Sequence, residues 1–511
     1  YRVTPLSLWN AASAGYAADA VVKALDGLSR FPIPSSVASW IPETMGRFGT
    51  LKIIPSDSED TLLLESSSER VYREVAASRH LSKFLEPESG PALRFSLAVL
   101  NRGTVKQELL KFGWPVKDEA PLRDGEPLEL SLREVSSAGK PISVREYQVA
   151  AASALVGDKS PGTGYGTIVL PCGAGKTVVG MQVMSLLKTS TLILTTNVAA
   201  VHQWIDELID KTTLTAEEIG EYTGESKDIR PVTVATYQIL TWRPAKEGPF
   251  PHFKLFRERA WGLVIYDEVH LLPAPVFRVT AEIQTIRRLG LTATLVREDG
   301  CEGDVFSLVG PKRYDVPWKD LEGQGWIASA FCTEVRIDLP ERLEIEYAVS
   351  GMRQKYRIAS ENPDKYPVVR ELVARHEGDG ILVIGQYIDQ LERVARELGA
   401  PIITGKTPNS ERDRIYGEFR AGKIRVLVVS KVANFAIDLP DASVAIQISG
   451  SFGSRQEEAQ RLGRILRPKE RPSHFYTVVT ARTVEEEFAA NRQKFLAEQG
   501  YEYEIVRWSE R

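Results

Sequence analysis

The fold is decided by one stretch of the sequence, which reads TIVLPCGAGKTVVGMQVMSLL and covers residues 167–187. An apolar run typical of a buried strand comes first, followed by a loop with two glycines and then an apolar helical pattern. Glycines in such a loop let backbone N–H groups turn towards phosphate oxygens, and the helix start adds partial positive charge. The stretch therefore predicts a phosphate-binding loop in which Lys176 reaches the β- and γ-phosphates and Thr177 ligates Mg²⁺.

A pair of acids supports this interpretation. Only the core of the loop motif is present, because the full pattern has a glycine where this chain has Leu170. Asp267 and Glu268, however, directly follow another apolar run at residues 263–266. A carboxylate at a strand end can hold Mg²⁺, and its neighbour can orient or deprotonate the attacking water. Taken alone the pair is equally well explained as an acidic turn, but together with the loop it predicts an ATP and Mg²⁺ site.

From Ser143 onwards, short β-branched runs alternate with helical patterns, which is typical of parallel sheets. Two sets of runs predict two α/β domains at 135–318 and 319–511, with strands at residues 167–170, 191–194, 232–235, 263–266, 381–384, 426–429, 444–447 and 475–478. Residues 341–370 interrupt the alternation, which predicts an insertion. Residues 1–134 read as a separate region that carries no recognisable chemistry. The stretch from Lys117 to Pro141, rich in charge, proline and glycine, predicts a linker.

The composition is that of a globular protein. Of 511 residues, 43% are hydrophobic and 26% charged, which excludes a largely disordered or fibrous chain. The formal net charge is −4, so any nucleic-acid site must be local. The three cysteines are scattered, and no apolar run approaches the ~18 residues of a membrane span. We therefore expect a cytoplasmic protein without a disulfide framework, a metal cluster or a membrane partner.

Five motifs follow one another along the chain: Arg145-Glu146-Tyr147-Gln148, Leu170-Pro171-Cys172-Gly173-Ala174-Gly175-Lys176-Thr177, Asp267-Glu268-Val269-His270, Leu291-Thr292-Ala293-Thr294 and Gln460-Arg461-Leu462-Gly463-Arg464-Ile465-Leu466-Arg467. Their order and spacing resemble superfamily 2 helicases, specifically the XPB (xeroderma pigmentosum group B) type in its bacterial or archaeal form. The resemblance runs from Val144 to about Tyr503. It implies an α/β fold of two tandem RecA-like parallel-sheet domains, an N-terminal α+β domain that includes a damage-recognition-like region, and a small thumb-like insertion.

The resemblance also implies roles at the nucleotide. Arg145 and Gln148 would read adenine, and the phosphates and Mg²⁺ would be held by Gly173, Ala174, Gly175, Lys176, Thr177 and Asp267. Arg464 and Arg467 are three residues apart and share a helix face, so both can stabilise charge on the γ-phosphate as arginine fingers, with Gln460 as a companion. The implied catalytic set is Lys176, Asp267, Glu268, Gln460, Arg464 and Arg467, and the implied coupling residues are His270, Thr292 and Thr294.

For DNA, the resemblance places strand separation at Arg297, Glu298 and Asp299, directly after the fourth motif. In the thumb-like insertion, cations alternate with an aromatic that could stack on a base, at Arg353, Lys355, Tyr356 and Arg357. Hydroxyl and ammonium groups at strand ends suit phosphate contacts, and the candidates are Thr196, Thr236 and Lys431, with Trp204 on the helix that follows Thr196. Trp204 is equally well explained as a core aromatic. The segment after Lys431 departs from many superfamily 2 members, which have glycine in place of Ala436.

The motifs predict an ATP-dependent DNA helicase or translocase, and the resemblance implies 3′–5′ polarity and a role in nucleotide excision repair or transcription-linked DNA opening. Single-stranded or forked DNA is the expected partner, with a nuclease or a repair or transcription protein as a second one. The expected location is the cytoplasm of a prokaryote, in association with the nucleoid. Two alternatives remain open: a duplex translocase that does not separate strands, and a non-hydrolysing scaffold whose nucleotide state controls a nuclease or transcription partner. Lys176, Glu268 and Arg464 count against the scaffold.

Overall fold

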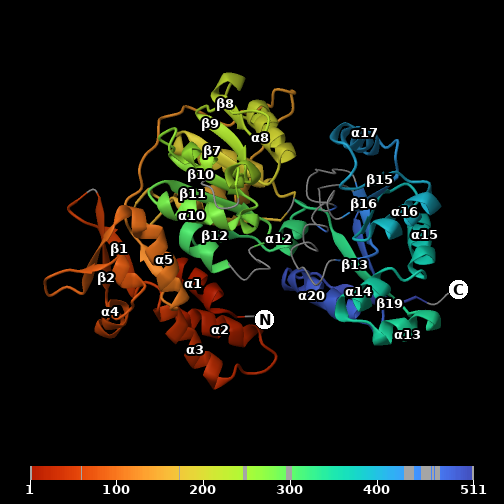
Figure 1. Ribbon diagram of the computed structural model, residues 1–511, viewed down its shortest axis with the longest axis horizontal. Coiled ribbons are helices and arrows are strands. Elements are labelled where there is room, and N and C mark those ends of the chain that lie inside the picture. The colour runs from red at the N-terminus through yellow and green to blue at the C-terminus, as the bar shows by residue number, and fades with distance from the viewer. Residues whose placement is uncertain are drawn as a thin grey trace. The chain divides into compact units, whose positions relative to one another are not determined.

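The computed structural model describes residues 3–58, 60–160, 162–171, 173–245, 250–294, 302–430, 442–450, 462, 465 and 472–508. The chain divides into two compact units (Figure 1). The first comprises Tyr1–Val169 and Lys176–Asp315, and the second Leu170–Gly175 and Val316–Arg511. Each unit contains a seven-stranded sheet, and the first also carries an N-terminal α+β domain. The predicted fold class of two tandem parallel sheets after an α+β domain is confirmed.

The N-terminal domain consists of helices followed by a five-stranded sheet. Thr4 starts the first helix, because its side chain accepts a hydrogen bond from the backbone N–H of Ser7, and the Ser7 hydroxyl accepts one from the backbone N–H of Thr4. The sheet has the order β3-β4-β2-β1-β5, and β5 pairs with β1 in parallel. The elements are α1 (Pro5–Ser13), α2 (Ala18–Leu28), α3 (Ser35–Gly46), β1 (Leu51–Pro55), β2 (Thr61–Ser66), α4 (Glu69–Ala76), η1 (Leu81–Lys83), β3 (Glu86–Pro87), β4 (Arg94–Ala98), η2 (Val99–Asn101), α5 (Arg102–Lys111) and β5 (Val116–Asp118).

The rest of the first unit is built on a parallel sheet of order β12-β6-β11-β10-β7-β9-β8, here called the P-loop sheet. β7 and β9 are buried at every residue, as expected for a sheet covered on both faces. The elements are α6 (Glu146–Val156), β6 (Tyr165–Val169), α7 (Lys176–Leu187), β7 (Thr191–Thr195), α8 (Val198–Lys211), η3 (Ala216–Glu218), β8 (Ile219–Tyr222), β9 (Val232–Thr236), α9 (Tyr237–Thr241), η4 (Pro251–Phe256), β10 (Leu263–Asp267), η5 (Val269–Leu271), α10 (Ala274–Glu282), β11 (Arg287–Thr292), α11 (Glu302–Asp304), η6 (Val305–Val309) and β12 (Lys312–Asp315).

The stretch between Lys117 and Pro141 is not the linker that its composition predicts. It runs along the P-loop sheet as an ordered strap, because its backbone N–H groups bond to carbonyls of that domain: Glu126 to Ala260 at 2.8 Å, Leu128 to Lys188 at 3.0 Å and Arg133 to Lys211 at 2.8 Å. Gly125 lies so close to the backbone of Gly262 that a Cβ on it would come within 2.1 Å of the Gly262 nitrogen. The absence of a side chain here allows close packing rather than flexibility.

The second unit is built on a parallel sheet of order β15-β16-β14-β17-β18-β13-β19. The four strands expected near residues 381, 426, 444 and 475 are β14, β16, β17 and β18. The elements are α12 (Trp318–Gly323), β13 (Ala330–Ile337), α13 (Glu341–Val349), α14 (Met352–Ser360), α15 (Lys365–Arg375), β14 (Gly380–Gly385), α16 (Ile388–Leu398), β15 (Ile402–Ile403), α17 (Asn409–Arg420), β16 (Val426–Ser430), β17 (Ala442–Gln447), β18 (Ser473–Thr480), α20 (Val484–Glu498) and β19 (Tyr503–Arg507).

The interruption at residues 341–370 contains two extra helices, α13 and α14, and the first residues of α15. Figure 1 shows α14 beside α20, and the two helices are in contact. α13 buries none of its residues, whereas the second half of α14 is buried. Nowhere in the described chain does a helix combine the length and hydropathy needed to cross a bilayer.

A buried ion pair stabilises the second unit. Lys365 of α15 and Glu485 of α20 are 0% and 1% exposed, and their charged atoms lie 2.7 Å apart. Lys365 also donates to the carbonyls of Ile448 and Val478, and Glu485 accepts from the backbone N–H of Thr480. Burial lowers the pKa of Lys365, although the charge of Glu485 opposes this. The two charges thus depend on each other.

We predict that Lys365→Met destabilises the second unit by about 3 to 5 kcal/mol, because it leaves the Glu485 carboxylate buried without its cation. Lys365→Met/Glu485→Leu should recover part of the loss. Arg414→Met, which removes an exposed ion pair with Glu411, is the control and should cause no measurable change. Scanning calorimetry of the full chain measures all three. Equal stability of Lys365→Met and Arg414→Met would contradict the role of the buried pair.

Candidate nucleotide and DNA site

The predicted motifs of the first unit meet at one edge of the P-loop sheet. β6, β11 and β10 are neighbours, with Thr292 paired to Val169 and Asp267 paired to Leu291. Parallel strands end at the same edge, so Thr292 of β11 and Asp267 of β10 lie next to the end of β6, from which the glycine loop continues. Lys176 then begins α7. The structure therefore brings together three motifs that lie at residues 170–177, 267–270 and 291–294 of the sequence.

The glycine loop has the backbone conformation that its composition predicts. Gly173 and Gly175 have φ values of +80° and +77°, a region that residues with a Cβ rarely adopt. The backbone N–H of Ala174 donates to the Pro171 carbonyl at 3.2 Å. Thr177, partly buried, follows Lys176 in the first turn of α7. A glycine loop that leads into a helix N-terminus suits a phosphate group.

Lys176 is paired with the predicted general base. Its Nζ lies 3.2 Å from Oε1 of Glu268, and the two side chains are 12% and 23% exposed. Burial alone would raise the pKa of Glu268, but the charges of Lys176 and His270 lower it below its ordinary value. Glu268 has φ +50° and ψ +52°, a left-handed conformation that costs free energy for a residue with a side chain. Such strain is typical of functional positions.

Asp267 is held by groups that the sequence did not single out for this purpose. The indole Nε1 of Trp204 in α8 donates to Oδ2 of Asp267 at 2.9 Å, and the backbone N–H of Glu268 donates to Oδ1 at 3.0 Å. The hydroxyl of Tyr237, the first residue of α9, donates to the Asp267 carbonyl at 2.9 Å. Burial and the neighbouring Glu268 charge raise the pKa of Asp267. The buried negative charge at this strand end is thus oriented by two aromatic donors.

The donor set fits a magnesium ion. Mg²⁺ prefers hard oxygen ligands, usually one or two protein oxygens together with substrate phosphates. Asp267 supplies a carboxylate at the end of β10, and Thr177 supplies a hydroxyl in the first turn of α7. Oε2 of Glu268 is buried, has no hydrogen-bond partner within the described chain, and lies 3.4 Å from Nδ1 of His270. Two adjacent carboxylates in a buried position attract a dication.

The three predicted coupling residues lie together. Nδ1 of His270 and Oγ1 of Thr292 are 2.5 Å apart, and the same hydroxyl accepts from the backbone N–H of Thr294 at 3.1 Å. All three residues are at most 3% exposed. His270, two residues after the acid pair, is therefore joined directly to the end of β11.

The predicted adenine-reading residues start α6. Arg145 is the N-cap of α6, and its backbone N–H donates to Oε1 of Gln148 at 2.9 Å. The Arg145 guanidinium donates to the hydroxyl of Tyr147 at 2.9 Å. α6 packs on α7, so these residues lie on the helix next to the one that Lys176 begins.

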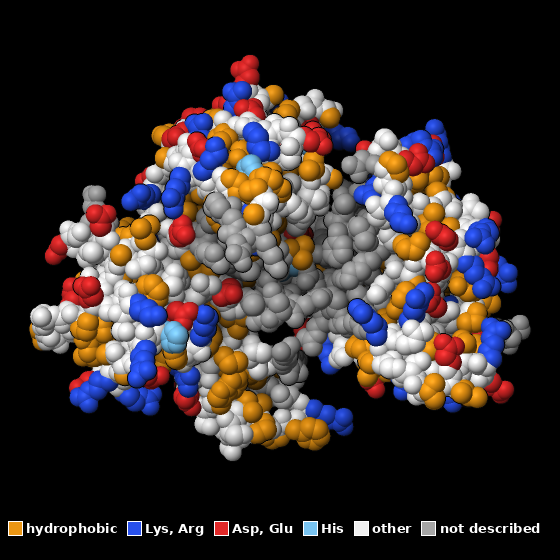
Figure 2. Space-filling model, viewed as in Figure 1, with side chains coloured by type: hydrophobic (Ala, Val, Ile, Leu, Met, Phe, Trp, Pro, Cys, Tyr) orange, Lys and Arg blue, Asp and Glu red, His pale blue; other side chains and the backbone are white. Residues whose placement is uncertain are grey.

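The predicted DNA contacts Thr196 and Thr236 lie at neighbouring strand ends, because β7 and β9 pair through Thr195 and Thr236. Thr236 is 4% exposed and caps α9, accepting from the backbone N–H of Ile239 at 3.2 Å. Thr196 is partly exposed and accepts from the Asn197 side chain. Figure 2 shows Lys and Arg interspersed with Asp and Glu on the drawn face, without a broad basic field. Any DNA site on that face is local.

Two aromatic residues predicted to touch DNA are buried. Trp204 is 2% exposed, and its ring packs so tightly on Gly180 of α7 that a Cβ there would lie 2.7 Å from it. Tyr356 is 0% exposed, and its hydroxyl donates to the Gly450 carbonyl at 2.6 Å. Neither ring is accessible in this structure, so it gives no support to a DNA contact at either residue. For Trp204 the alternative, a core aromatic, holds instead.

The cations beside Tyr356 do face solvent. Arg353 and Arg357 are exposed and Lys355 is partly exposed. Lys355 lies 5.4 Å from the ring of Tyr347 on α13, and Nε of Arg357 lies 2.5 Å from Oε2 of Glu361. The predicted contacts at Arg297, Glu298, Asp299 and Lys431 and the predicted catalytic residues Gln460, Arg464 and Arg467 lie outside the described residues.

Comparisons with known proteins define the class first. The model described as "ERCC3/RAD25/XPB C-terminal helicase" matches residues 321–510, "Type III restriction enzyme, res subunit" matches 141–297, and "Helicase conserved C-terminal domain" matches 1–88. The solved structure "S. cerevisiae Dbp5 bound to RNA and ADP BeF3" has a similar fold, with a TM-score of 0.50 and 15% identity over 72% of this chain and 90% of that one. Fold, motifs and family models together define an ATP-hydrolysing helicase of superfamily 2.

The curated relatives narrow the class. Proteins of Kineococcus radiotolerans and Mycobacterium tuberculosis, both named "DNA 3'-5' helicase XPB", are 53% and 50% identical over 99% of this chain, covering 89% and 90% of their own lengths. An Encephalitozoon cuniculi protein, named "General transcription and DNA repair factor IIH helicase/translocase subunit XPB", is 34% identical over 99% of this chain and 76% of its own. The chain belongs to the XPB helicase family.

We predict that Glu268→Gln lowers ATP turnover by roughly 10²-fold or more, because a general base is worth that much. Its ATP affinity should stay equal or rise, because Lys176 loses the charge that holds it away from phosphate. Lys176→Ala should instead weaken ATP binding by roughly ten- to a hundredfold, through lost charge-assisted hydrogen bonds. Equilibrium binding and single-turnover assays separate the two effects. Lys188→Met, an exposed lysine just after α7, is the control. Parent-like turnover by Glu268→Gln would rule out the general base.

Proposed function

We propose that this protein uses ATP hydrolysis to move along DNA in the 3′–5′ direction and to separate its strands, in nucleotide excision repair or transcription-linked DNA opening. The names of the bacterial relatives support the polarity and the substrate, and the name of the Encephalitozoon cuniculi relative supports both transcription and DNA repair as settings. That last name also includes the word translocase, which favours duplex translocation without strand separation as the second candidate. Single-stranded or forked DNA is the partner in the main proposal.

The nucleotide chemistry follows from the acid pair. Lys176 leaves Glu268 for the β- and γ-phosphates when ATP binds, and this frees the carboxylate to orient and deprotonate the attacking water. Thr177 and Asp267 hold Mg²⁺, which shields the phosphate charge when bound. Arg464 and Arg467, with Gln460, stabilise the charge that builds on the γ-phosphate. Arg145 and Gln148 hold the adenine.

The observation that carries the proposal is the double hold on Asp267. The two predicted DNA contacts lie at the starts of the helices that carry these donors. Thr196 comes just before α8, which carries Trp204, and Thr236 caps α9, which begins with Tyr237. Trp204 reaches the carboxylate of Asp267 at 2.9 Å and Tyr237 reaches its carbonyl at 2.9 Å. A DNA strand that binds across the ends of β7 and β9 therefore shifts the helices that orient the magnesium ligand. DNA binding stimulates hydrolysis by this route.

Strand separation belongs to Arg297, Glu298 and Asp299, with Lys431 as a further phosphate contact and the exposed cations of the thumb-like insertion as a second contact to the junction. His270, Thr292 and Thr294 report the state of the nucleotide to the rest of the motor. A nuclease or a repair or transcription protein is the expected protein partner. A cytoplasmic, nucleoid-associated location in a prokaryote completes the proposal.

Trp204→Phe tests the route from DNA to Asp267. It keeps the ring volume against Gly180 but removes the indole donor, so turnover stimulated by single-stranded DNA should fall by roughly tenfold or more, the worth of a hydrogen bond to a charged group. Turnover without DNA should change much less. Trp242→Phe, at a Trp that is 53% exposed, is the matched control. Steady-state ATPase assays with and without DNA measure the ratio. An equal loss in both assays would contradict the coupling.

The Arg297→Ala/Glu298→Ala/Asp299→Ala variant should lose displacement of a forked strand while keeping most of its DNA-stimulated ATPase, because these residues belong neither to the glycine loop nor to the acid pair. Arg353→Ala/Lys355→Ala/Arg357→Ala, which leaves the buried Tyr356 intact, should show a similar but weaker separation of the two activities. Forked substrates with 3′ or 5′ tails also test the polarity. Retained displacement would leave these residues without a role at the junction, and ATPase without any displacement by the parent would favour the duplex translocase.

A further inference from the structure

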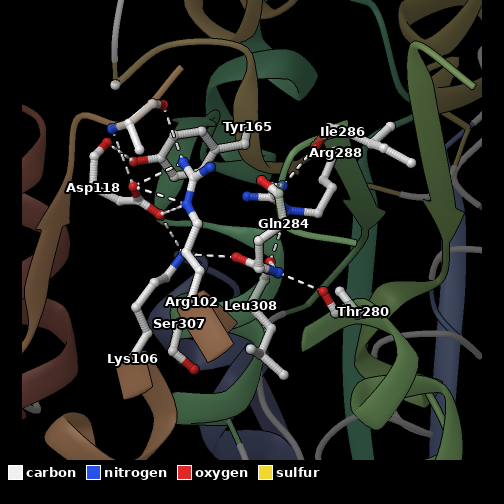
Figure 3. Close-up of polar contacts among 12 residues, drawn as sticks. Arg102, Lys106, Asp118, Tyr165, Thr280, Gln284, Ile286, Arg288, Ser307 and Leu308 are labelled. Carbon is white, nitrogen blue, oxygen red and sulfur yellow. Dashed lines mark hydrogen bonds and ion pairs between the residues drawn. The ribbon is translucent and has the colours of Figure 1, made fainter. Parts of the chain in front are cut away.

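A buried polar network joins the N-terminal domain to the P-loop sheet (Figure 3). From the N-terminal domain it includes Arg102 and Lys106 of α5 and Asp118 of β5; from the P-loop sheet domain it includes Tyr165, Gln284 and Arg288. Every member is at most 6% exposed. We call these six residues the Asp118 network. None of them belongs to the motifs that bind or hydrolyse the nucleotide.

The N-terminal end of the network is a carboxylate shared by two cations. Oδ2 of Asp118 accepts from Nε of Arg102 and from Nζ of Lys106, both at 2.9 Å, and Oδ1 accepts from Nη2 of Arg102 at 2.8 Å. Burial alone would raise the pKa of Asp118, but the charges of Arg102 and Lys106 lower it far below its usual range. The carboxylate therefore stays charged, and it fixes both cations in place.

Lys106 carries the connection across. Its Nζ donates to Oε1 of Gln284 at 2.8 Å while it holds Asp118 at 2.9 Å. A second connection runs from the hydroxyl of Tyr165 to the Asp118 carbonyl at 2.7 Å. Lys106, Arg288 and Arg313 lie 5.5, 5.1 and 5.3 Å from the centre of the Tyr165 ring, so three cations lie close to one aromatic ring. Burying more positive than negative charge costs desolvation free energy, so this arrangement is not the one expected if the contact served only to hold the two domains together.

The far end of the network reaches the two strands that carry the acid pair and Thr292. Nε2 of Gln284 donates to the Thr280 carbonyl at 2.5 Å, and the Thr280 hydroxyl lies 3.0 Å from that of Tyr266, the residue before Asp267 in β10. Arg288 is the second residue of β11, four residues before Thr292. Its Nε donates to the Leu308 carbonyl at 2.8 Å, and Gln284 donates to the same carbonyl at 3.0 Å. The network is thus linked by buried hydrogen bonds to Tyr266 of β10 and through Arg288 to β11.

We propose that the N-terminal domain is a positioning element of the ATPase: through Lys106 and Gln284 it holds β10 and β11 in the alignment that places Asp267 and Glu268 beside Thr292. Lys106 and Gln284 are positioning residues, since neither touches the nucleotide. A force or a ligand on the N-terminal domain then changes turnover through α5. This inference rests on the roles proposed above for Asp267, Glu268 and Thr292.

The test compares three variants of the full chain. Gln284→Leu removes the link but leaves Asp118 with both cations, so it strands no charge. Lys106→Met leaves Asp118 paired with Arg102, and Lys106→Met/Gln284→Leu replaces both partners by apolar groups, which generally restores stability. Lys117→Met is the matched control, because this lysine lies next to Asp118 in β5 but is 46% exposed and pairs with Glu119.

All three network variants should lower DNA-stimulated turnover by roughly tenfold with an ATP KM within twofold of the parent, the pattern of lost transition-state alignment. Amide hydrogen exchange in β10 and β11, measured without nucleotide, should be faster in all three. The double variant should regain thermal stability but not turnover. If the double variant regains both thermal stability and turnover, or if exchange in β10 and β11 is unchanged, the network only holds the two domains together and the inference is overturned.

The outcome is separable from that of the proposed function. If Glu268→Gln turns over ATP like the parent, the assignment of the acid pair fails whatever the network variants do. If Glu268→Gln is inactive while Gln284→Leu keeps parent-like turnover and exchange, only the positioning role fails. Lys117→Met should match the parent in turnover, exchange and thermal stability, and a loss there would show that any charge change in β5 has the same effect.

Discussion

Two neighbouring carboxylates, Asp267 and Glu268, lie partly buried at the end of one strand, and their mutual repulsion is the constraint around which the nucleotide site of the first unit is organised. Three surrounding helices stabilise the pair. α7 supplies a cation to Glu268, α8 supplies an indole N–H to the carboxylate of Asp267, and α9 supplies a phenol hydroxyl to the carbonyl of Asp267. Each of these groups comes from an element that follows a different strand. The groups that stabilise the two acids therefore come from helices that start at the same edge of the P-loop sheet. Movement of α7, α8 or α9 alters the electrostatic field at the acids.

The same two strands are also gripped from the opposite direction. Their ends carry the acids and Thr292, while Tyr266 of β10 contacts Thr280, and Arg288, near the start of β11, donates to the carbonyls of Gln284 and Leu308. The acid pair thus receives its geometry from the helices at its edge and its strand alignment from the core behind it. A motor domain that is constrained at both places can respond to partners that never approach the nucleotide.

The sequence predicted the strands that contain a continuous apolar run and missed several that do not. β11 begins with Arg287 and Arg288, and a charged start hides a strand unless its buried partners are known. β13 and β19 alternate or are exposed, so they give no continuous apolar run. At the site, motif spacing brought Lys176 to Glu268 correctly. It could not show that Trp204 points inwards, because an aromatic on an amphipathic helix has the same spacing whether it faces core or solvent.

Composition also gave the wrong prediction for the strap at residues 117–141, which is an ordered part of the P-loop sheet domain and not a linker. Proline, glycine and charge suggested a place where the chain could be cut. In the folded protein the strap caps carbonyls at Lys188, Lys211 and Ala260, and Gly125 closes over Gly262. A shortened protein that begins at residue 135 would leave the carbonyls of Lys188, Lys211 and Ala260 without these backbone donors. A fragment designed around the P-loop sheet therefore has to retain residues that composition alone marks as a linker.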